Sequence, residues 1–110
     1  MSSVQRGEIV RLRPPRGARG HEQRGSRYGV VLQAGDLLAL STVIVAPTST
    51  SAQPASFRPE LTVGKTRTRV LIDQLTAVDS SRLGASAGSL TWEELVEVDR
   101  AVQLVLGLTR

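Results

Sequence analysis

A chain of 110 residues is long enough for one modest hydrophobic core and too short for two. It contains no cysteine and one histidine, which excludes disulfides, thiolate metal sites and multi-histidine metal sites, and no clustered carboxylates replace them. The net charge of +4 is unevenly distributed, because residues 1–27 carry +5 and residues 91–110 carry −2. Thirteen of the fourteen basic residues are arginines, whose planar guanidinium binds phosphate bidentately. The basic N-terminal third therefore predicts contact with a polyanion.

Hydropathy and cysteine content indicate where the protein works. No apolar run reaches the roughly 18 residues that suggest a membrane-spanning helix. The segment Met1–Arg13 is too highly charged for a signal peptide. The absence of cysteine suits a reducing compartment. We expect a cytoplasmic protein without membrane contact, organised as a single domain over residues 1–110, with no metal or other cofactor.

Strand-like segments dominate the first half of the chain. Residues 8–13 predict a first strand, which ends at two prolines, and residues 14–26 form a long Gly/Arg loop. A loop of that length in a small domain is usually functional or disordered. Residues 28–33 predict a second strand. A turn then leads into residues 37–46, which are apolar and β-branched towards their end, so we expect them to form the most buried strand.

The next segments predict a hairpin and a short strand. Residues 47–59 are rich in Ser, Thr and Pro and form a connection. Residues 60–63 and 66–73 predict the two strands of a hairpin, joined by Gly64 and Lys65. Residues 75–78 predict a sixth and final strand.

The C-terminal segment changes to a helical period. Apolar residues follow a 3/4/3 spacing at Leu95, Val98, Val102 and Val105. A capping box begins at Thr91, and Gly107 is a suitable stop. Six short strands and an amphipathic helix predict a mainly β fold, in which a small curled sheet or barrel is covered by the helix.

The candidate chemistry lies where a polar, glycine-bounded loop runs into an apolar strand, at Arg27. Side chains on a loop anchored by a strand are accessible and precisely held. The chain has no Gly-x-Ser-x-Gly elbow, no Walker loop and no dinucleotide fingerprint, and a lone loop histidine such as His21 is more often solvated than catalytic. What remains is arginine and hydroxyl groups. Such a site can bind phosphate, and it can cleave RNA because the 2′-hydroxyl of RNA is its own nucleophile.

Four short motifs resemble, in collinear order, those of the MazF/PemK toxin ribonucleases. They are Arg6-Gly7-Glu8, Gly20-His21-Glu22-Gln23 through Arg27 with the following strand, Val43 to Pro47-Thr-Ser, and Asp73-Gln74-Leu75. The resemblance covers nearly the whole chain. It implies a small SH3-like β-barrel of the CcdB/PemK kind with a C-terminal helix packed against it.

The resemblance also implies a function. Members of this family are sequence-selective, metal-independent endoribonucleases that cleave single-stranded RNA by 2′-hydroxyl attack and so inhibit translation and growth. It implies a homodimer with mRNA, rRNA or tRNA bound in a groove between subunits. A cognate antitoxin would place an acidic tail in that groove, which we expect to be lined by arginines: Arg13, Arg16, Arg19, Arg24 and Arg27.

Matching the motifs residue by residue assigns roles within this chain. Arg27 takes the position of the catalytic arginine, and Ser49 that of the catalytic threonine; a one-residue shift would make Thr48 or Thr50 the hydroxyl. Tyr28 replaces the usual proline after the catalytic arginine, which frees the backbone there. The expected substrate-binding residues are Glu22, Gln23, Arg24, Arg19, His21 and Gln74.

Other interpretations of these residues remain open. Arg27 can be a solvated charge at a strand end, Ser49 a turn former, and Glu22 a neutralising partner for neighbouring arginines. The rival function is a non-enzymatic toxin like the related CcdB proteins, which poison DNA gyrase by contacting protein. The Gly-x-Glu-Gln-x-x-x-Arg pattern favours the ribonuclease.

Overall fold

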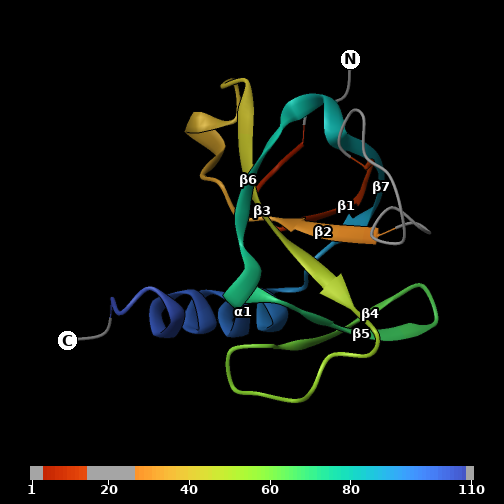
Figure 1. The fold of residues 1–110 in the computed structure, drawn as a ribbon, viewed down its shortest axis with the longest axis vertical. Coiled ribbons are helices and arrows are strands. Elements are labelled where there is room, and N and C mark those ends of the chain that lie inside the picture. Colours follow the sequence, from red (N-terminus) through yellow and green to blue (C-terminus); the bar gives the residue numbers. More distant parts are fainter. Residues whose placement is uncertain (1–3, 15–26, 109–110) are drawn as a thin grey trace.

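A curled antiparallel sheet with one helix lying against it forms the structure, a computed structural model that describes residues 4–14 and 27–108 (Figure 1). The expected mainly β fold with a C-terminal helix is confirmed. Within the described residues the strands are β1 Glu8–Leu12, β2 Arg27–Val31, β3 Thr42–Ser49, β4 Glu60–Val63, β5 Thr66–Val70, β6 Thr76–Asp79 and β7 Leu83–Ser89. The helix is α1 Trp92–Val105, and short 3-10 turns are η2 Gly35–Leu37, η3 Ile72–Gln74 and η4 Ser80–Arg82.

Strand β3 is the centre of the sheet. The hydrogen-bonded order is β4-β5-β3-β2-β1-β7, and β6 also pairs with β3. The first half of β3 pairs with β6, whereas its end pairs with β5 through Thr48 and Ser49. Because the two partners leave β3 in different directions, the sheet curls into a half-barrel with the β4–β5 hairpin at its lower end (Figure 1).

Both faces of the sheet are buried at the end of β2 and in the middle of β3. Neighbouring residues of a strand point to opposite faces. Val30 packs in a cluster that includes Val98 and Ala101 of α1, whereas Val31 packs in a second cluster with Val43 and Val78. This two-sided burial explains why these strands are continuous apolar runs rather than alternating ones.

Helix α1 follows its sequence signals closely. The Thr91 hydroxyl accepts from the Glu94 amide, the Glu94 carboxylate accepts from the Thr91 amide, and Gly107 ends the helix with a φ of 69°. Arg6 donates from Nε to the Leu32 carbonyl and pairs with Asp99 of α1. The first residue of the Arg6-Gly7-Glu8 motif therefore ties the helix to the sheet.

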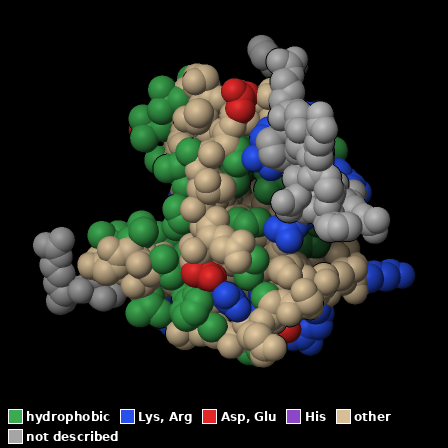
Figure 2. Space-filling view, viewed as in Figure 1, with side chains coloured by type: hydrophobic (Ala, Val, Ile, Leu, Met, Phe, Trp, Pro, Cys, Tyr) green, Lys and Arg blue, Asp and Glu red, His purple; other side chains and the backbone are tan. Residues whose placement is uncertain are grey.

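The predicted strand over residues 37–46 is wrong in its first half. The segment 35–41 forms η2 and turns, and β3 begins only at Thr42. The buried side chain of Gln33 replaces strand pairing here, because its amide donates to the Leu37 and Thr42 carbonyls and accepts from the Ile44 amide. Leu37, at the end of η2, is 52% exposed. Figure 2 shows hydrophobic side chains gathered on the surface over this part of the chain.

The prediction that residues 75–78 form the last strand is also wrong. Strand β7 follows, pairing antiparallel with β1 through irregular register. After Leu83 it consists of Gly, Ala and Ser, which have little β propensity, so no local signal marks it. A larger residue at position 84 would be crowded, because a Cβ on Gly84 would lie 3.1 Å from the Arg11 carbonyl oxygen. Separately, no helix in residues 4–14 and 27–108 is long and apolar enough to cross a membrane.

Candidate active site

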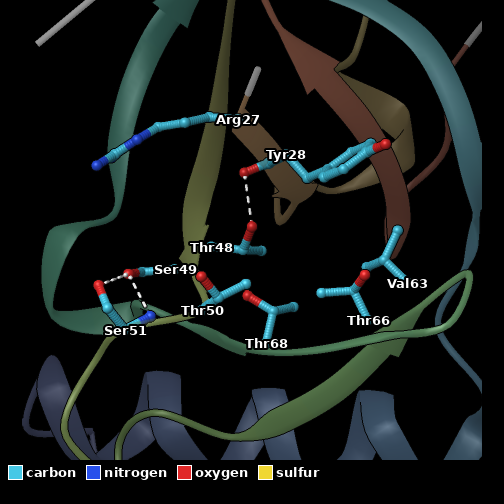
Figure 3. Close-up of a pocket in the computed structure, with 9 residues that line it drawn as sticks. All are labelled: Arg27, Tyr28, Thr48, Ser49, Thr50, Ser51, Val63, Thr66 and Thr68. Carbon is cyan, nitrogen blue, oxygen red and sulfur yellow. Dashed lines mark hydrogen bonds between the residues drawn. The ribbon is translucent and has the colours of Figure 1, made fainter. Parts of the chain in front are cut away.

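A pocket of about 390 Å³ opens where β2 begins and β3 ends (Figure 3). Three structural units contribute: the start of β2, the end of β3 with the turn after it, and the β4–β5 hairpin. The described residues that line it carry mostly hydroxyl groups and one cation: Arg27, Tyr28, Thr48, Ser49, Thr50, Ser51, Val63, Thr66 and Thr68. The candidate catalytic residues predicted from sequence thus share one cavity.

Strand register explains why Arg27 and Ser49 line the same pocket. Strands β2 and β3 pair antiparallel with Gly29 opposite Pro47. Continuing this register by two residues places Arg27 across from Ser49, 22 positions later in the chain. Both side chains come from strand ends, where the backbone is held but the surface is open. Figure 3 shows the Arg27 guanidinium extending over the side of the pocket that Ser49 and Ser51 occupy.

The hydroxyls of Thr48 and Ser49 have different environments. Thr48 is 7% exposed, and its Oγ1 donates to the Tyr28 carbonyl oxygen at 3.2 Å. Ser49 is partly exposed, and its Oγ lies 3.2 Å from the Ser51 Oγ and accepts from the Ser51 amide at 3.3 Å. The Thr48 hydroxyl therefore joins β3 to β2, whereas the Ser49 hydroxyl hydrogen-bonds only with its near neighbour Ser51 among the described residues and is partly open to solvent.

Arg27 carries the positive charge of the pocket. It is exposed, and within residues 4–14 and 27–108 it forms no hydrogen bond or ion pair. Its neighbour Tyr28 differs, because the Arg11 guanidinium stacks 5.3 Å from the Tyr28 ring centroid. An arginine whose donors have no partner in the described fold can turn all of them towards a bound anion.

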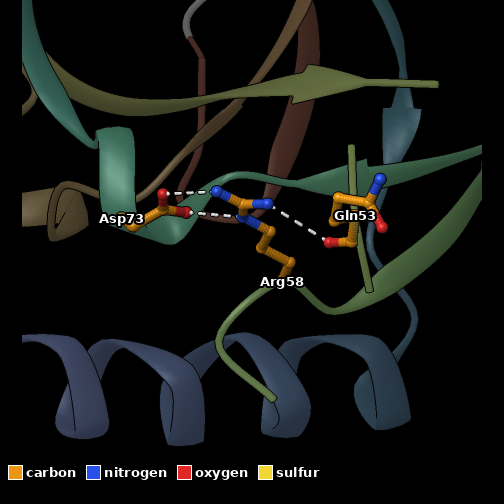
Figure 4. Close-up of polar contacts among 3 residues, drawn as sticks. All are labelled: Gln53, Arg58 and Asp73. Carbon is orange, nitrogen blue, oxygen red and sulfur yellow. Dashed lines mark hydrogen bonds and ion pairs between the residues drawn. The ribbon is translucent and has the colours of Figure 1, made fainter. Parts of the chain in front are cut away.

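An ion pair holds the connection that follows the pocket (Figure 4). The Arg58 guanidinium binds both Asp73 carboxylate oxygens, at 3.1 and 2.9 Å, and also donates to the Gln53 carbonyl. The hydrogen bonds from Arg58 hold the pKa of Asp73 below its ordinary value. Residues 50–59 are thereby fixed to η3. This segment includes Ser51, whose amide and hydroxyl contact the Ser49 hydroxyl.

This pair predicts a pH dependence of stability. Because the pKa of Asp73 is lowered on folding, the pair stabilises the fold above the unfolded pKa of about 3.9, and this contribution is lost as pH falls through the lower folded value. In Asp73→Asn we expect a lower free energy of unfolding at pH 7, and a difference from the unsubstituted protein that shrinks towards pH 3. Urea denaturation at both pH values measures it. The control is Asp36→Asn, an exposed carboxylate without an ion pair in the described part of the chain. An unchanged difference at pH 3 would contradict the role of Asp73.

One of the predicted substrate-binding residues, Gln74, is among the described residues, and it lies outside this pocket. Gln74 is exposed on η3 and is absent from the lining. Arg13, expected in an arginine-lined groove, donates to the Ser81 and Leu83 carbonyls and is therefore occupied in joining β1 to the start of β7. The other predicted residues lie outside the described residues: Arg19, His21, Glu22, Gln23 and Arg24, with Arg16.

Sequence reasoning missed the floor of the pocket. Thr66 and Thr68 come from β5, and Val63 from β4. A threonine in a predicted hairpin strand does not indicate a functional role, because β-branched residues are common in strands whatever the function. In residues 4–14 and 27–108, no group of three or more His, Cys, Asp or Glu side chains is arranged to hold a metal ion.

Comparison with known families identifies the chain. A family model described as PemK-like, MazF-like toxin of type II toxin–antitoxin systems matches residues 5–106. The chain belongs to the PemK/MazF toxin family. The match spans every strand and the helix of the half-barrel, so the resemblance inferred from four motifs is confirmed.

Individual proteins similar to this PemK/MazF family member support the same assignment. It is 45% identical over 106 residues to the candidate toxin Rv3098A of Mycobacterium tuberculosis, covering 96% of this chain and 99% of the relative. Among solved structures, an endoribonuclease from a mycobacterial species in complex with its cognate antitoxin superposes with a TM-score of 0.80 at 16% identity, covering 98% and 99% of the two chains. MazF from Deinococcus radiodurans gives a TM-score of 0.78 at 24% identity, covering 97% and 99%. At these identities the structures establish the shared fold.

Proposed function

We propose that this PemK/MazF family member is a metal-independent endoribonuclease toxin that cleaves single-stranded RNA. The observation that carries the proposal is one pocket containing Arg27, which has no partner among residues 4–14 and 27–108, together with an accessible hydroxyl, Ser49. The fold is shared with a protein described as an endoribonuclease. The expected reaction leaves a 2′,3′-cyclic phosphate and a free 5′-hydroxyl, and it takes place in the cytoplasm.

The mechanism that suits this pocket uses the substrate's own nucleophile. The 2′-hydroxyl attacks the adjacent phosphorus, its proton leaves, and the bond from phosphorus to the 5′-oxygen breaks as that oxygen gains a proton. Arg27 would stabilise the negative charge that grows on the phosphorane oxygens. The Ser49 hydroxyl would orient the phosphate by hydrogen bonding, held in place by Ser51. No protein nucleophile is needed.

Incubation of the purified protein with an RNA pool in EDTA tests the proposal. We expect cleavage at a restricted set of sequences, with products that accept a 5′-phosphate from a kinase without prior dephosphorylation. Intact RNA would instead favour the non-enzymatic, CcdB-like toxin that acts on a protein such as DNA gyrase. Cleavage only after addition of a divalent metal would contradict the mechanism.

The two candidate hydroxyls predict different mutant behaviour. We expect Ser49→Ala to lower kcat about 100-fold while leaving the melting temperature unchanged, and Ser49→Thr to retain activity, because only the hydroxyl acts. We expect Thr48→Val to cost about 1 kcal/mol of stability, because the Tyr28 carbonyl loses its donor, with a small effect on kcat. Single-turnover kinetics and thermal melts separate the effects. A silent Ser49→Ala combined with an inactive, folded Thr48→Val would transfer the role to Thr48.

The partners follow from the same proposal. We propose a homodimer, supported by exposed apolar side chains at one corner and along β3: Leu37, Leu40 and Ile44. A monomeric mass by light scattering at micromolar concentration would contradict it.

We further propose a cognate antitoxin whose acidic, partly disordered tail competes with RNA for the Arg27 pocket, since solved neighbours are complexes with antitoxins. Simultaneous, independent binding of RNA and antitoxin would contradict a shared site.

A further inference from the structure

Thr68 has a hydroxyl that the described fold leaves without a partner. The residue is 5% exposed on β5, and its Oγ1 is buried without a hydrogen bond. Among the described residues it is the one buried side-chain polar atom in this condition. Figure 3 shows the Thr68 side chain rising from β5 into the pocket, on the side opposite Tyr28. The unpartnered group therefore lies at the candidate active site.

Burying an unpaired hydroxyl destabilises a protein, because the group loses its hydrogen bonds to water. Valine has nearly the same shape as threonine and is equally favoured in strands. At a position that served only packing, valine would fill the space without this cost. A threonine at this position is therefore explained if a ligand bound in the pocket forms a hydrogen bond with its hydroxyl. A change of the side-chain rotamer exchanges the hydroxyl with the methyl group and can turn it towards such a partner.

The pocket walls favour a neutral, flat and polar occupant at this depth. Among the described lining residues, the cation Arg27 lies at the rim and the others are uncharged: hydroxyls with the side chains of Tyr28 and Val63. A phosphate would stay near Arg27. A nucleobase suits the floor, because it presents hydrogen-bonding edges to hydroxyls and π faces to an aromatic side chain. The volume of about 390 Å³ is within the range of about 300–1,000 Å³ usual for small-molecule sites.

We propose that Thr68 is a substrate-binding residue whose hydroxyl hydrogen-bonds to a nucleobase flanking the scissile phosphate. The inference rests on the proposed ribonuclease function. It adds a place where base identity is sensed: Arg27 and Ser49 handle the phosphate, and β5 contacts the neighbouring base.

The test compares Thr68→Val with Thr62→Val, a control that removes an exposed threonine hydroxyl from the other strand of the same hairpin. The probe is a short RNA with a cleavage site mapped using the unsubstituted protein, with deoxyribose at the attacking nucleotide so that it is bound but not cut. We expect Thr68→Val to raise the Kd, measured by fluorescence anisotropy, about threefold to tenfold, the usual effect of one hydrogen bond. Thr62→Val should leave the Kd unchanged, and the melting temperature of Thr68→Val should not fall.

An abasic scan of the same RNA separates a binding role from a structural one. Removing the pocket base should weaken binding to the unsubstituted protein more than to Thr68→Val, because that variant has already lost the contact. Equal losses at every position, or a Kd unaffected by Thr68→Val, would overturn the inference while the ribonuclease proposal stands. Loss of antitoxin binding with unchanged RNA binding would overturn it too.

Thr68→Ala removes the same hydroxyl and gives the same comparison if the valine variant does not fold. Failure of the unsubstituted protein to bind or cleave RNA would overturn both proposals.

Discussion

Arg27→Ala is expected to lower kcat at least 100- to 1,000-fold, about 2.7–4 kcal/mol of transition-state stabilisation, the usual cost of losing one donor to a developing oxyanion. Its guanidinium is the positive charge of the pocket and makes no hydrogen bond or ion pair to the described residues. Removing it should therefore leave the melting temperature unchanged. Single-turnover cleavage of a mapped RNA, followed with enzyme in excess, measures the chemical step directly.

Two further variants sharpen this result. Arg27→Lys should recover little activity, because an ammonium is a point charge and cannot reproduce a bidentate fork. Arg100→Ala is the matched control: it removes an exposed arginine from α1, outside the pocket, and should be fully active. Added guanidinium ion should partly restore cleavage by Arg27→Ala but not by an unfolded variant. Near-normal kcat in folded Arg27→Ala would contradict the site assignment.

Replacement of one ribose by deoxyribose is expected to abolish cleavage. The proposed nucleophile is the 2′-hydroxyl of the nucleotide on the 5′ side of the scissile phosphate. Without this hydroxyl no group attacks the phosphorus, so proton transfer and charge stabilisation cannot promote cleavage. Binding should be largely retained, because phosphate contacts dominate the affinity of proteins for nucleic acids. Gel analysis of end-labelled RNA gives the cleavage, and anisotropy gives the Kd.

The control RNA carries the same deoxyribose one nucleotide to the 3′ side of the scissile phosphate. It lacks a 2′-hydroxyl at a position that takes no part in the attack, so it should be cleaved at a nearly normal rate in EDTA. Cleavage of the first deoxy-substituted RNA would mean that water is the nucleophile. Arg27 would then still bind phosphate, but the proposed chemistry would be wrong.

Local signals were sufficient for much of this fold. The period of Leu95, Val98, Val102 and Val105 and the capping box at Thr91 predicted α1 almost to the residue, since both depend on contacts within one or two turns. The β4–β5 hairpin was predicted around Gly64, whose φ of 62° suits a tight turn. The strand–loop junction at Arg27 was found because charge and hydropathy change abruptly there.

The sequence by itself therefore determined the helix, most strands, the family and the two side chains, Arg27 and Ser49, proposed for the chemistry. Only the tertiary structure decided what depends on distant partners. Strand β7 exists because β1 offers an edge and the backbone approaches closely at Gly84. The segment after Gln33 leaves the sheet because that one side chain satisfies its backbone groups. In the sequence, Thr68 cannot be told from any other strand threonine. Its hydroxyl becomes notable only when the fold places β5 beneath the ends of β2 and β3, where no described residue hydrogen-bonds to it.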